Sequence, residues 1–236
     1  MNGKIENIIG SGFLANQFKV HAKLIQKMNI CIYAAGVSNS LCRNKKYLNR
    51  DFNRIKNFIK FLKNQKLVYI STCTIFDPSR NKSEYIKNKI KIEKYIRKKV
   101  SNYKIIRLPE LAGISKNKNT LTNFLYNNII NSKKFVAYAN SKRNLLDVND
   151  AIKLCLYFLR YSNKKIINIA NLKNYDVLDV ILVFKKILKI LPVYELTNIK
   201  FSNFKIKNSI NKNILKKNKL IINKHYLYKI IKKYYV

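Results

Sequence analysis

A short apolar run, Ile5 to Ile9, leads directly into a glycine-rich turn and then into a helical pattern that continues to about Met28. The turn has a G-x-G-x-x-A arrangement and reads Gly10-Ser11-Gly12-Phe13-Leu14-Ala15. Between a strand and a helix, the first glycine permits a tight turn, the second lets the backbone approach a pyrophosphate, and the alanine allows close packing of helix on strand. The stretch therefore predicts a parallel α/β fold that opens with a dinucleotide-binding turn.

A second apolar run begins at Leu67 and ends in two hydroxyl residues, Ser71 and Thr72. Its β-branched and aromatic residues predict a buried strand. Open parallel sheets carry their chemistry at the carboxyl ends of such strands. We therefore expect the hydroxyl of Thr72 to lie at the site and to hold a substrate oxygen.

A helix predicted to begin near Ser83 carries Tyr85 and Lys89 four positions apart, so both lie on one face. A nearby ammonium favours the phenolate and lowers the pKa of a phenol. Lys89 could thus make Tyr85 a proton donor or acceptor at neutral pH. In a chain rich in tyrosine and lysine this spacing also arises by chance, but the strand end at Ser71 and Thr72 favours the catalytic interpretation.

Together these stretches resemble the short-chain dehydrogenase/reductase superfamily, most closely its extended branch of nucleotide-sugar epimerases, dehydratases and 4-keto reductases. The run Ser71-Thr72-Cys73-Thr74-Ile75-Phe76 is similar to the family signature ST-x-x-(V/I)-(Y/F). The resemblance implies that Thr72, Tyr85 and Lys89 are catalytic and that Lys89 also binds the nicotinamide ribose. Dehydratases of the branch carry an Asp-Glu pair where this chain has Cys73 and Thr74, so a reductase or epimerase is favoured.

The resemblance extends to two further strand ends. Ala34-Ala35-Gly36 follows a predicted strand, Ile30 to Tyr33, and is similar to an (N/H)-x-A-(A/G) motif beside the nicotinamide; a tightly packed turn is the alternative. Arg107, Pro109 and Gly113 resemble R-x-P-x-x-x-G. The cofactor-binding residues implied by the resemblance are Gly10, Gly12, Phe13, Leu14, Ala15, Ala34, Ala35, Gly36, Tyr85, Lys89 and Pro109.

The run Lys142 to Asp150 is similar to the R-(D/N)-(F/Y)-(I/V)-x-V-x-D of nucleotide-sugar enzymes, with Leu145 in place of the aromatic residue. By that match Arg143 contacts a substrate diphosphate, which suits a planar and permanently charged donor; an ordinary surface cation is the alternative. Asp150 is expected to cap a helix from Ala151 to Arg160. The substrate-binding residues implied are Thr72, Cys73 and Arg143.

The chain is shorter than the family pattern between its first helix and Ile30, where a second strand, a helix and a third strand belong. No Asp or Glu occurs between Glu6 and Asp51, so the usual clamp on the adenosine ribose is absent. We predict a Rossmann-like, three-layer α/β/α fold whose mostly parallel sheet lacks its second and third strands, plus a small C-terminal substrate-binding lobe. The expected division is 1–113 for the dinucleotide-binding domain and 114–236 for the substrate region, with 151–190 returning to complete the sheet.

Patterning predicts the remaining elements of the chain. The helices expected are Arg50 to Lys63, Thr120 to Asn131, Asp176 to Leu188 and Tyr226 to Tyr235, and the strands are Tyr103 to Leu108, Phe135 to Tyr138, Lys165 to Ala170 and Tyr194 to Leu196.

The formal net charge of +38 arises from 49 Lys and Arg against 11 Asp and Glu. Because the lysines are scattered through the whole chain, we favour a compositional bias over a polyanion site, although no acidic residue follows Glu195. The four cysteines, Cys31, Cys42, Cys73 and Cys155, form no Cys-x-x-Cys pair, and the two histidines lie far apart, so neither disulfides nor a metal site is expected. No apolar run has the length of a membrane span, and a cytoplasmic location is the default.

The sequence therefore predicts an oxidoreductase or epimerase that uses NAD or NADP and acts on a nucleotide-activated sugar. The partners expected are a nucleotide-sugar substrate and, as an open possibility, a second copy in a homodimer. The alternative is a non-catalytic protein that keeps the scaffold and binds RNA or another polyanion through its basic surface; this reading is less favoured because the set Thr72, Tyr85 and Lys89 is intact.

Overall fold

The computed structural model describes residues 7–80, 83–198 and 204–236. Its centre is a five-stranded parallel sheet in the order β1-β2-β3-β4-β9. The strands are β1 (Ile8–Ile9), β2 (Ile30–Tyr33), β3 (Lys66–Thr72), β4 (Tyr103–Leu108) and β9 (Ile166–Asn168).

The sheet begins at β1, as predicted. Strand β1 pairs directly with β2, and within the described residues the order continues only away from it. Helix α2 (Ala22–Lys27) ends three residues before β2 begins, so the connection has no room for further strands. The predicted Rossmann-like fold without its second and third strands is confirmed.

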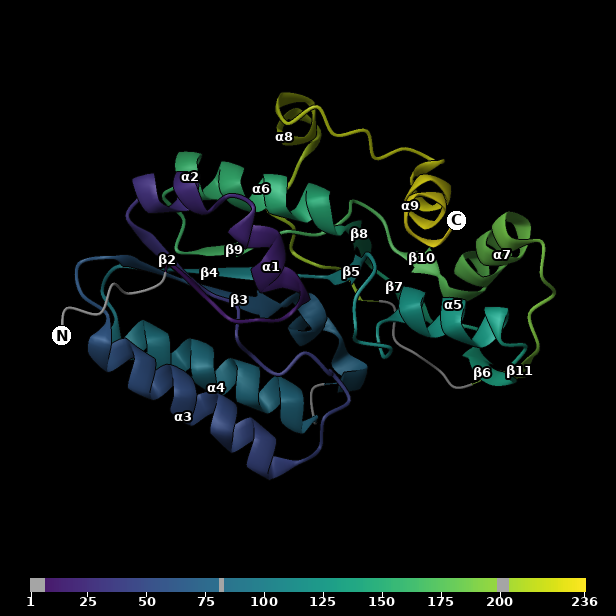
Figure 1. Cartoon of the computed structure of the whole chain (residues 1–236), viewed down its shortest axis with the longest axis horizontal. Coiled ribbons are helices and arrows are strands. Elements are labelled where there is room, and N and C mark those ends of the chain that lie inside the picture. The colour runs from purple at the N-terminus through teal and green to yellow at the C-terminus, as the bar shows by residue number, and fades with distance from the viewer. Residues whose placement is uncertain (1–6, 81–82, 199–203) are drawn as a thin grey trace.

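Helices cover both faces of the sheet (Figure 1). One face carries α1 (Phe13–Lys19), α2 and α6 (Val148–Tyr161), and the other carries α3 (Lys45–Phe61) and α4 (Glu84–Lys99). Since side chains alternate along a strand, Val68 and Ile70 of β3 enter the core below α1, α2 and α6, while Leu67 and Tyr69 enter the core below α3 and α4. The three layers predicted from sequence are therefore present.

Local capping explains where the helices of the second face begin. The side chain of Asn44 accepts hydrogen bonds from the N–H groups of Lys46 and Tyr47 at the start of α3. Ser83 accepts one from the N–H of Ile86 at the start of α4. Such side chains satisfy N–H groups that have no partner within the helix. The helix start predicted near Ser83 is confirmed.

Two helix predictions need correction. The first helical segment is not continuous to Met28, because a turn at Val20 and His21 separates α1 from α2. Helix α6 begins at Val148, and its cap is Asp147, whose side chain accepts from the N–H groups of Asn149 and Asp150. Asp150 therefore lies inside the first turn of the helix, where it cannot be the cap.

Most of the remaining elements form a lobe beyond the carboxyl ends of β3 and β4 (Figure 1). It contains three two-stranded sheets that pair β5 with β8, β6 with β11 and β7 with β10. Its strands and helices are β5 (Glu110–Ala112), α5 (Leu121–Ile130), β6 (Phe135–Tyr138), β7 (Lys142–Arg143), β8 (Leu145–Asp147), β10 (Tyr175–Asp176), α7 (Val177–Leu188), β11 (Tyr194–Thr197) and α9 (Tyr226–Tyr235). Helix α8 (Lys212–Lys217) lies instead near α6 (Figure 1). Helix α6 and β9 return to the main sheet, whereas α7 packs in the lobe against α5 and α9. The domain division at residue 113 stays a prediction.

Helix α9 is linked to α5 and α6 by hydrogen bonds of its tyrosines. The Tyr226 hydroxyl donates to Asp150 at 2.8 Å and accepts from the N–H of Asp147 at 3.0 Å. The Tyr235 hydroxyl lies 2.8 Å from the Thr122 hydroxyl and 2.6 Å from the Asn123 side-chain oxygen. The helix thus ties the first turn of α6 to the first turn of α5. No helix in the described parts of the chain is long and apolar enough to cross a membrane.

Candidate active site

The glycine turn after β1 is tightly packed at Gly10. This residue has φ +135°, and a Cβ added to it would lie 2.7 Å from the Ala34 carbonyl oxygen and 3.1 Å from the Ala15 Cβ. Only glycine fits such a backbone and such a gap. The structure thus brings together Gly10, Ala15 and Ala34, three of the residues predicted to surround a cofactor.

Gly12 has the opposite environment. It is exposed at the start of α1, and a Cβ added there would meet no atom within 4 Å. The next residue, Phe13, packs instead across the molecule, since a Cβ on Gly113 would lie 2.7 Å from its ring. Leu14 is half-buried against the main core. The backbone at Gly12 is therefore open to a ligand, while its neighbours are part of the packing.

The first two turns of α4 hold Tyr85 and Lys89, which are 7% and 4% exposed. The Lys89 ammonium lies 5.7 Å from the centre of the Tyr85 ring and donates a hydrogen bond to the Tyr69 hydroxyl at 3.2 Å. A Cβ on Gly36 would lie 2.5 Å from that ammonium nitrogen. The absence of a side chain at Gly36 is thus what lets Lys89 rest on the turn after β2, where Ala35 is also half-buried.

A buried ion pair fixes α4 against the sheet. The Arg107 guanidinium on β4 contacts both oxygens of the Glu93 carboxylate, at 3.0 and 2.5 Å, and the Ser71 hydroxyl donates to the same carboxylate at 2.6 Å. The bidentate geometry makes this a directional contact. Glu93 lies one turn after Lys89 on α4, so the pair sets the position of the helix that carries Tyr85 and Lys89.

Burial governs the electrostatics of this cluster. Desolvation lowers the pKa of the Lys89 ammonium, while the carboxylates of Asp51 and Glu93 act in the opposite direction. Burial also raises the pKa of the Tyr69 hydroxyl well above its ordinary value, and Asp51 adds to that shift. The neutral phenol of Tyr69 therefore serves Lys89 as a hydrogen-bond acceptor.

Thr72 and Cys73 lie at the carboxyl end of β3, where the 3-10 helix η1 (Cys73–Phe76) begins; η2 (Pro78–Arg80) follows it. The Thr72 hydroxyl donates to the Thr74 hydroxyl at 2.8 Å and accepts from the Thr74 N–H at 3.1 Å. The Cys73 thiol is 1% exposed, lies 3.3 Å from the Arg107 carbonyl oxygen, and has its pKa raised to about 12 by burial. Its side chain points into the core, so only the backbone of Cys73 could contact a substrate.

The two remaining predicted residues lie farther along the chain. Pro109 is half-buried at the junction of β4 and β5. Arg143 lies on β7, opposite Tyr175 of β10, and its guanidinium donates to the Lys142 carbonyl at 3.0 Å. Arg143 therefore belongs to the lobe and not to the cluster around Lys89.

The comparison with known families follows from this geometry. The model of the NAD dependent epimerase/dehydratase family matches residues 14–170, which is more than half of the chain. The chain belongs to this family. The match agrees with the epimerase and dehydratase resemblance predicted from the sequence motifs. No curated protein matches the chain.

Several solved structures share the fold of this chain. UDP-glucuronic acid 4-epimerase from Bacillus cereus, in complex with UDP-glucuronic acid and NAD, has a TM-score of 0.69 and 15% identity over 98% of this chain and 88% of that chain. RMD from Pseudomonas aeruginosa, complexed with NADPH, has a TM-score of 0.65 and 11% identity over 87% and 82%. The UDP-Glc/GlcNAc 4-epimerase from Campylobacter jejuni has a TM-score of 0.66 and 16% identity over 94% and 81%. At these identities the likeness shows the fold alone.

The motifs shared with the epimerase/dehydratase family miss Tyr69 and Glu93 of the cluster, and also Asp51 on α3, which is 5% exposed. Its signal in the sequence is an acid inside an apolar stripe, between Leu48 and Ile55, which are both buried. Polar residues at such positions are rare unless they meet another polar group.

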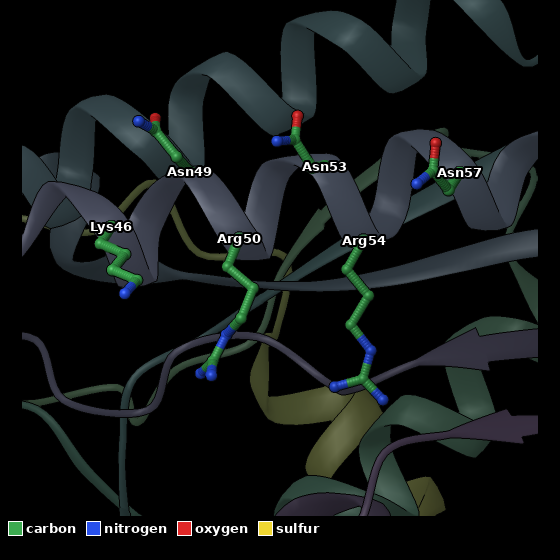
Figure 2. A pocket seen from close by; sticks show the side chains of 6 residues that line it. All are labelled: Lys46, Asn49, Arg50, Asn53, Arg54 and Asn57. Carbon is green, nitrogen blue, oxygen red and sulfur yellow. The ribbon is translucent and has the colours of Figure 1, made fainter.

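The outer side of α3 carries a groove that the family motifs do not predict either. Figure 2 shows Lys46, Arg50 and Arg54 along one side of the helix, with asparagines on the neighbouring stripe. The groove is lined by Lys46, Asn49, Arg50, Asn53, Arg54 and Asn57, all of them exposed.

Proposed function

We propose that this protein is an NAD- or NADP-dependent oxidoreductase or epimerase that acts on a nucleotide-activated sugar, with Tyr85 as proton donor and acceptor. The observation that carries the proposal is the buried pair of Tyr85 and Lys89 on α4, with the Lys89 ammonium resting on Gly36. Membership of the epimerase/dehydratase family supports it. So do the related folds crystallised with NAD, NADPH or UDP-glucuronic acid.

The residues around the glycine turn fit a dinucleotide. Gly12 leaves open space beside its backbone, and Ala15 and Ala34 pack too closely against Gly10 to admit a side chain there. Phe13, Leu14, Ala35, Gly36 and Pro109 complete the proposed lining. When bound, a nicotinamide supplies the exchange of hydride with the substrate carbon, and the work of the chain itself is to move the proton.

Tyr85 would take the proton of a substrate hydroxyl as a phenolate, or return it to a carbonyl as a phenol. The Lys89 ammonium favours the phenolate because it places a positive charge near the ring. Thr72 would exchange its hydrogen bond to Thr74 for one to the substrate oxygen, and Arg143 would meet the substrate diphosphate. The identity of the sugar is left to experiment.

Calorimetric titration with NAD, NADH, NADP and NADPH tests the proposal. We expect saturable binding of one redox pair by the wild-type protein. Gly12→Ala places a methyl group in open space, so the variant folds, but its affinity should fall about tenfold or more if the cofactor approaches this backbone. Lys19→Ala, an exposed change on the same helix, is the control and should bind normally. Absence of binding to all four nucleotides would refute the enzyme proposal.

The groove on α3 supports a second candidate function, the binding of a polyanion such as RNA. Lys46, Arg50 and Arg54 follow one another at intervals of four residues, about 6 Å along the helix. Such a row can contact successive phosphates, and the neighbouring asparagines add hydrogen-bond donors and acceptors. This observation goes beyond the net charge, because it concentrates cations and amides in one groove.

Binding of a fluorescent RNA oligonucleotide at several salt concentrations tests this second candidate. Replacing Arg50 and Arg54 together by alanine should weaken binding. It should also reduce the slope of log affinity against log salt by an amount equivalent to about two phosphate contacts. The control removes two exposed lysines of α4, Lys98 and Lys99, and should leave the slope closer to that of the wild type. Equal losses of affinity in both variants would mean that RNA binds to the positive charge of the whole surface and not to this groove.

A further inference from the structure

Asp51 is a buried carboxylate next to the amine of Lys89. One of its oxygens, Oδ2, accepts two long hydrogen bonds of 3.4 Å, from the N–H of Val37 and from the side chain of Asn88. The other oxygen, Oδ1, is buried without a hydrogen-bond partner among the described residues. Both oxygens lie within 3.6 Å of the position of a Cβ on Gly36, and the Lys89 ammonium lies 2.5 Å from that same position. The carboxylate and the amine therefore both approach the same glycine, and among the described residues they interact through charge without a direct hydrogen bond.

Burying a carboxylate with so few contacts is costly unless the charge serves a neighbour. Glu93, the other acid that acts on Lys89, is already held by Arg107 and Ser71. Asp51 has no such competing cation in the ion pairs described for this chain, and its charge has the larger effect on Lys89. Asp51 is thus the acid whose charge is directed at Lys89.

We propose that Asp51 is a positioning residue that holds the Lys89 ammonium over Gly36 and keeps it protonated. An effect of Asp51 on turnover rests on the proposed function, because only in that reaction does Lys89 act on Tyr85. The ionisation of Lys89 itself does not depend on any cofactor or substrate.

The groups that face Lys89 come from four elements. Asp51 lies on α3, Tyr69 on β3, and Tyr85 and Glu93 on α4 itself, with Arg107 of β4 behind Glu93. Burial pushes Lys89 toward the neutral amine, and the two carboxylates oppose this. Removal of the Asp51 charge leaves only Glu93, which already neutralises Arg107. The neutral amine should therefore become accessible at a lower pH.

Substitution of Asp51 by Asn tests the proposal because it preserves shape and removes the charge. The pKa of Lys89 would be followed by NMR in protein labelled with carbon-13 at the lysine ε-carbons, without cofactor, with the signal assigned by Lys89→Arg. We expect Asp51→Asn to lower the Lys89 pKa by about one unit or more, as for loss of an opposite charge at short range. Asp179→Asn, an exposed acid on α7, should leave it unchanged. An unchanged Lys89 pKa in Asp51→Asn would overturn the proposal.

Gly36→Ala provides a second variant if Asp51→Asn does not fold. The added methyl group meets the flexible end of Lys89 and not backbone, so the chain should fold while the ammonium is displaced. We expect the Lys89 pKa to change; an unaltered titration would contradict the placement over Gly36. If Asp51→Asn lowers the Lys89 pKa but the protein binds no nicotinamide nucleotide, the enzyme proposal is refuted and the positioning role of Asp51 stands.

Discussion

Tyr85 is the residue on which the proposed chemistry depends most directly. Replacing it by Phe removes the proton-transferring hydroxyl and leaves the ring in place, so turnover should fall about a hundredfold or more while cofactor affinity stays close to that of the wild type. Rates with a nucleotide sugar and calorimetric titration measure the two effects separately. Tyr95→Phe, on the same helix, is the control and should keep both. Full activity in Tyr85→Phe would exclude the assignment.

Arg143 is predicted to bind the substrate and not to take part in the reaction. Arg143→Ala should raise KM about tenfold or more with little change in kcat, because it removes a charged contact to the diphosphate that is equally present before and during the reaction. Arg160→Ala, exposed on α6, gives the comparison. An unchanged KM would make Arg143 an ordinary surface cation.

Lys104 shows how burial, with a smaller effect of the Lys66 charge, creates a pH dependence. It is 2% exposed, donates to the carbonyl oxygens of Phe158 and Ser162 at the end of α6, and has its pKa lowered from 10.5 to about 8 by burial. Between these values the unfolded chain holds the proton that the folded protein has released, so the contribution of Lys104 to stability rises with pH. Urea unfolding across this pH range should show that the free energy of unfolding of the wild type increases relative to that of Lys104→Met. A constant difference would contradict the lowered pKa.

At the scale of elements, the ion pair between Glu93 and Arg107 decides where α4 lies. Glu93→Gln leaves the partly buried Arg107 guanidinium without its carboxylate, which should cost about 2 kcal/mol in the free energy of unfolding. Glu84→Gln, at the exposed start of α4, should leave the melting temperature unchanged. Similar melting curves for the two variants would show that α4 is held by its apolar face alone.

Elements with a strong local pattern could be predicted from the sequence. Strands β3 and β4 and the start of α4 at Ser83 depend on apolar runs and on a capping residue within the segment itself. The start of α6 could not be predicted in the same way. Asp147 and Asp150 are both suitable caps, and the outcome depends on α9, whose Tyr226, Lys233 and Tyr234 contact these acids from more than 70 positions away. Local sequence does not contain that contact.

The same distinction applies to the candidate site. The glycine turn and the pair Tyr85 and Lys89 are visible as motifs, because each lies within one strand-to-helix unit. Asp51 is not visible in this way, since it meets Lys89 only when α3 and α4 pack side by side on the sheet (Figure 1). The roles of all these residues stay predictions until binding and turnover are measured.

At the scale of the whole molecule, the family fold persists without two strands of its sheet. Strand β1 becomes the edge within the described residues, and the chain passes from α2 to β2 in a few residues. The features that remain are those at the carboxyl ends of β2, β3 and β4, where the proposed proton transfer would take place. A cytoplasmic location and a homodimer stay predictions as well.

The role of α9 in fastening α5 and α6 has a consequence during synthesis. Four strands of the sheet, β1 to β4, have been synthesised once residue 108 is added, and they are neighbours both in sequence and in space. The hydroxyls of Tyr226 and Tyr235, which satisfy polar groups at residues 113–150, follow roughly a hundred residues later. Until then the first turns of both helices lack these hydroxyl partners, so the contacts that α9 makes in the lobe form after the first four strands of the sheet are able to pair.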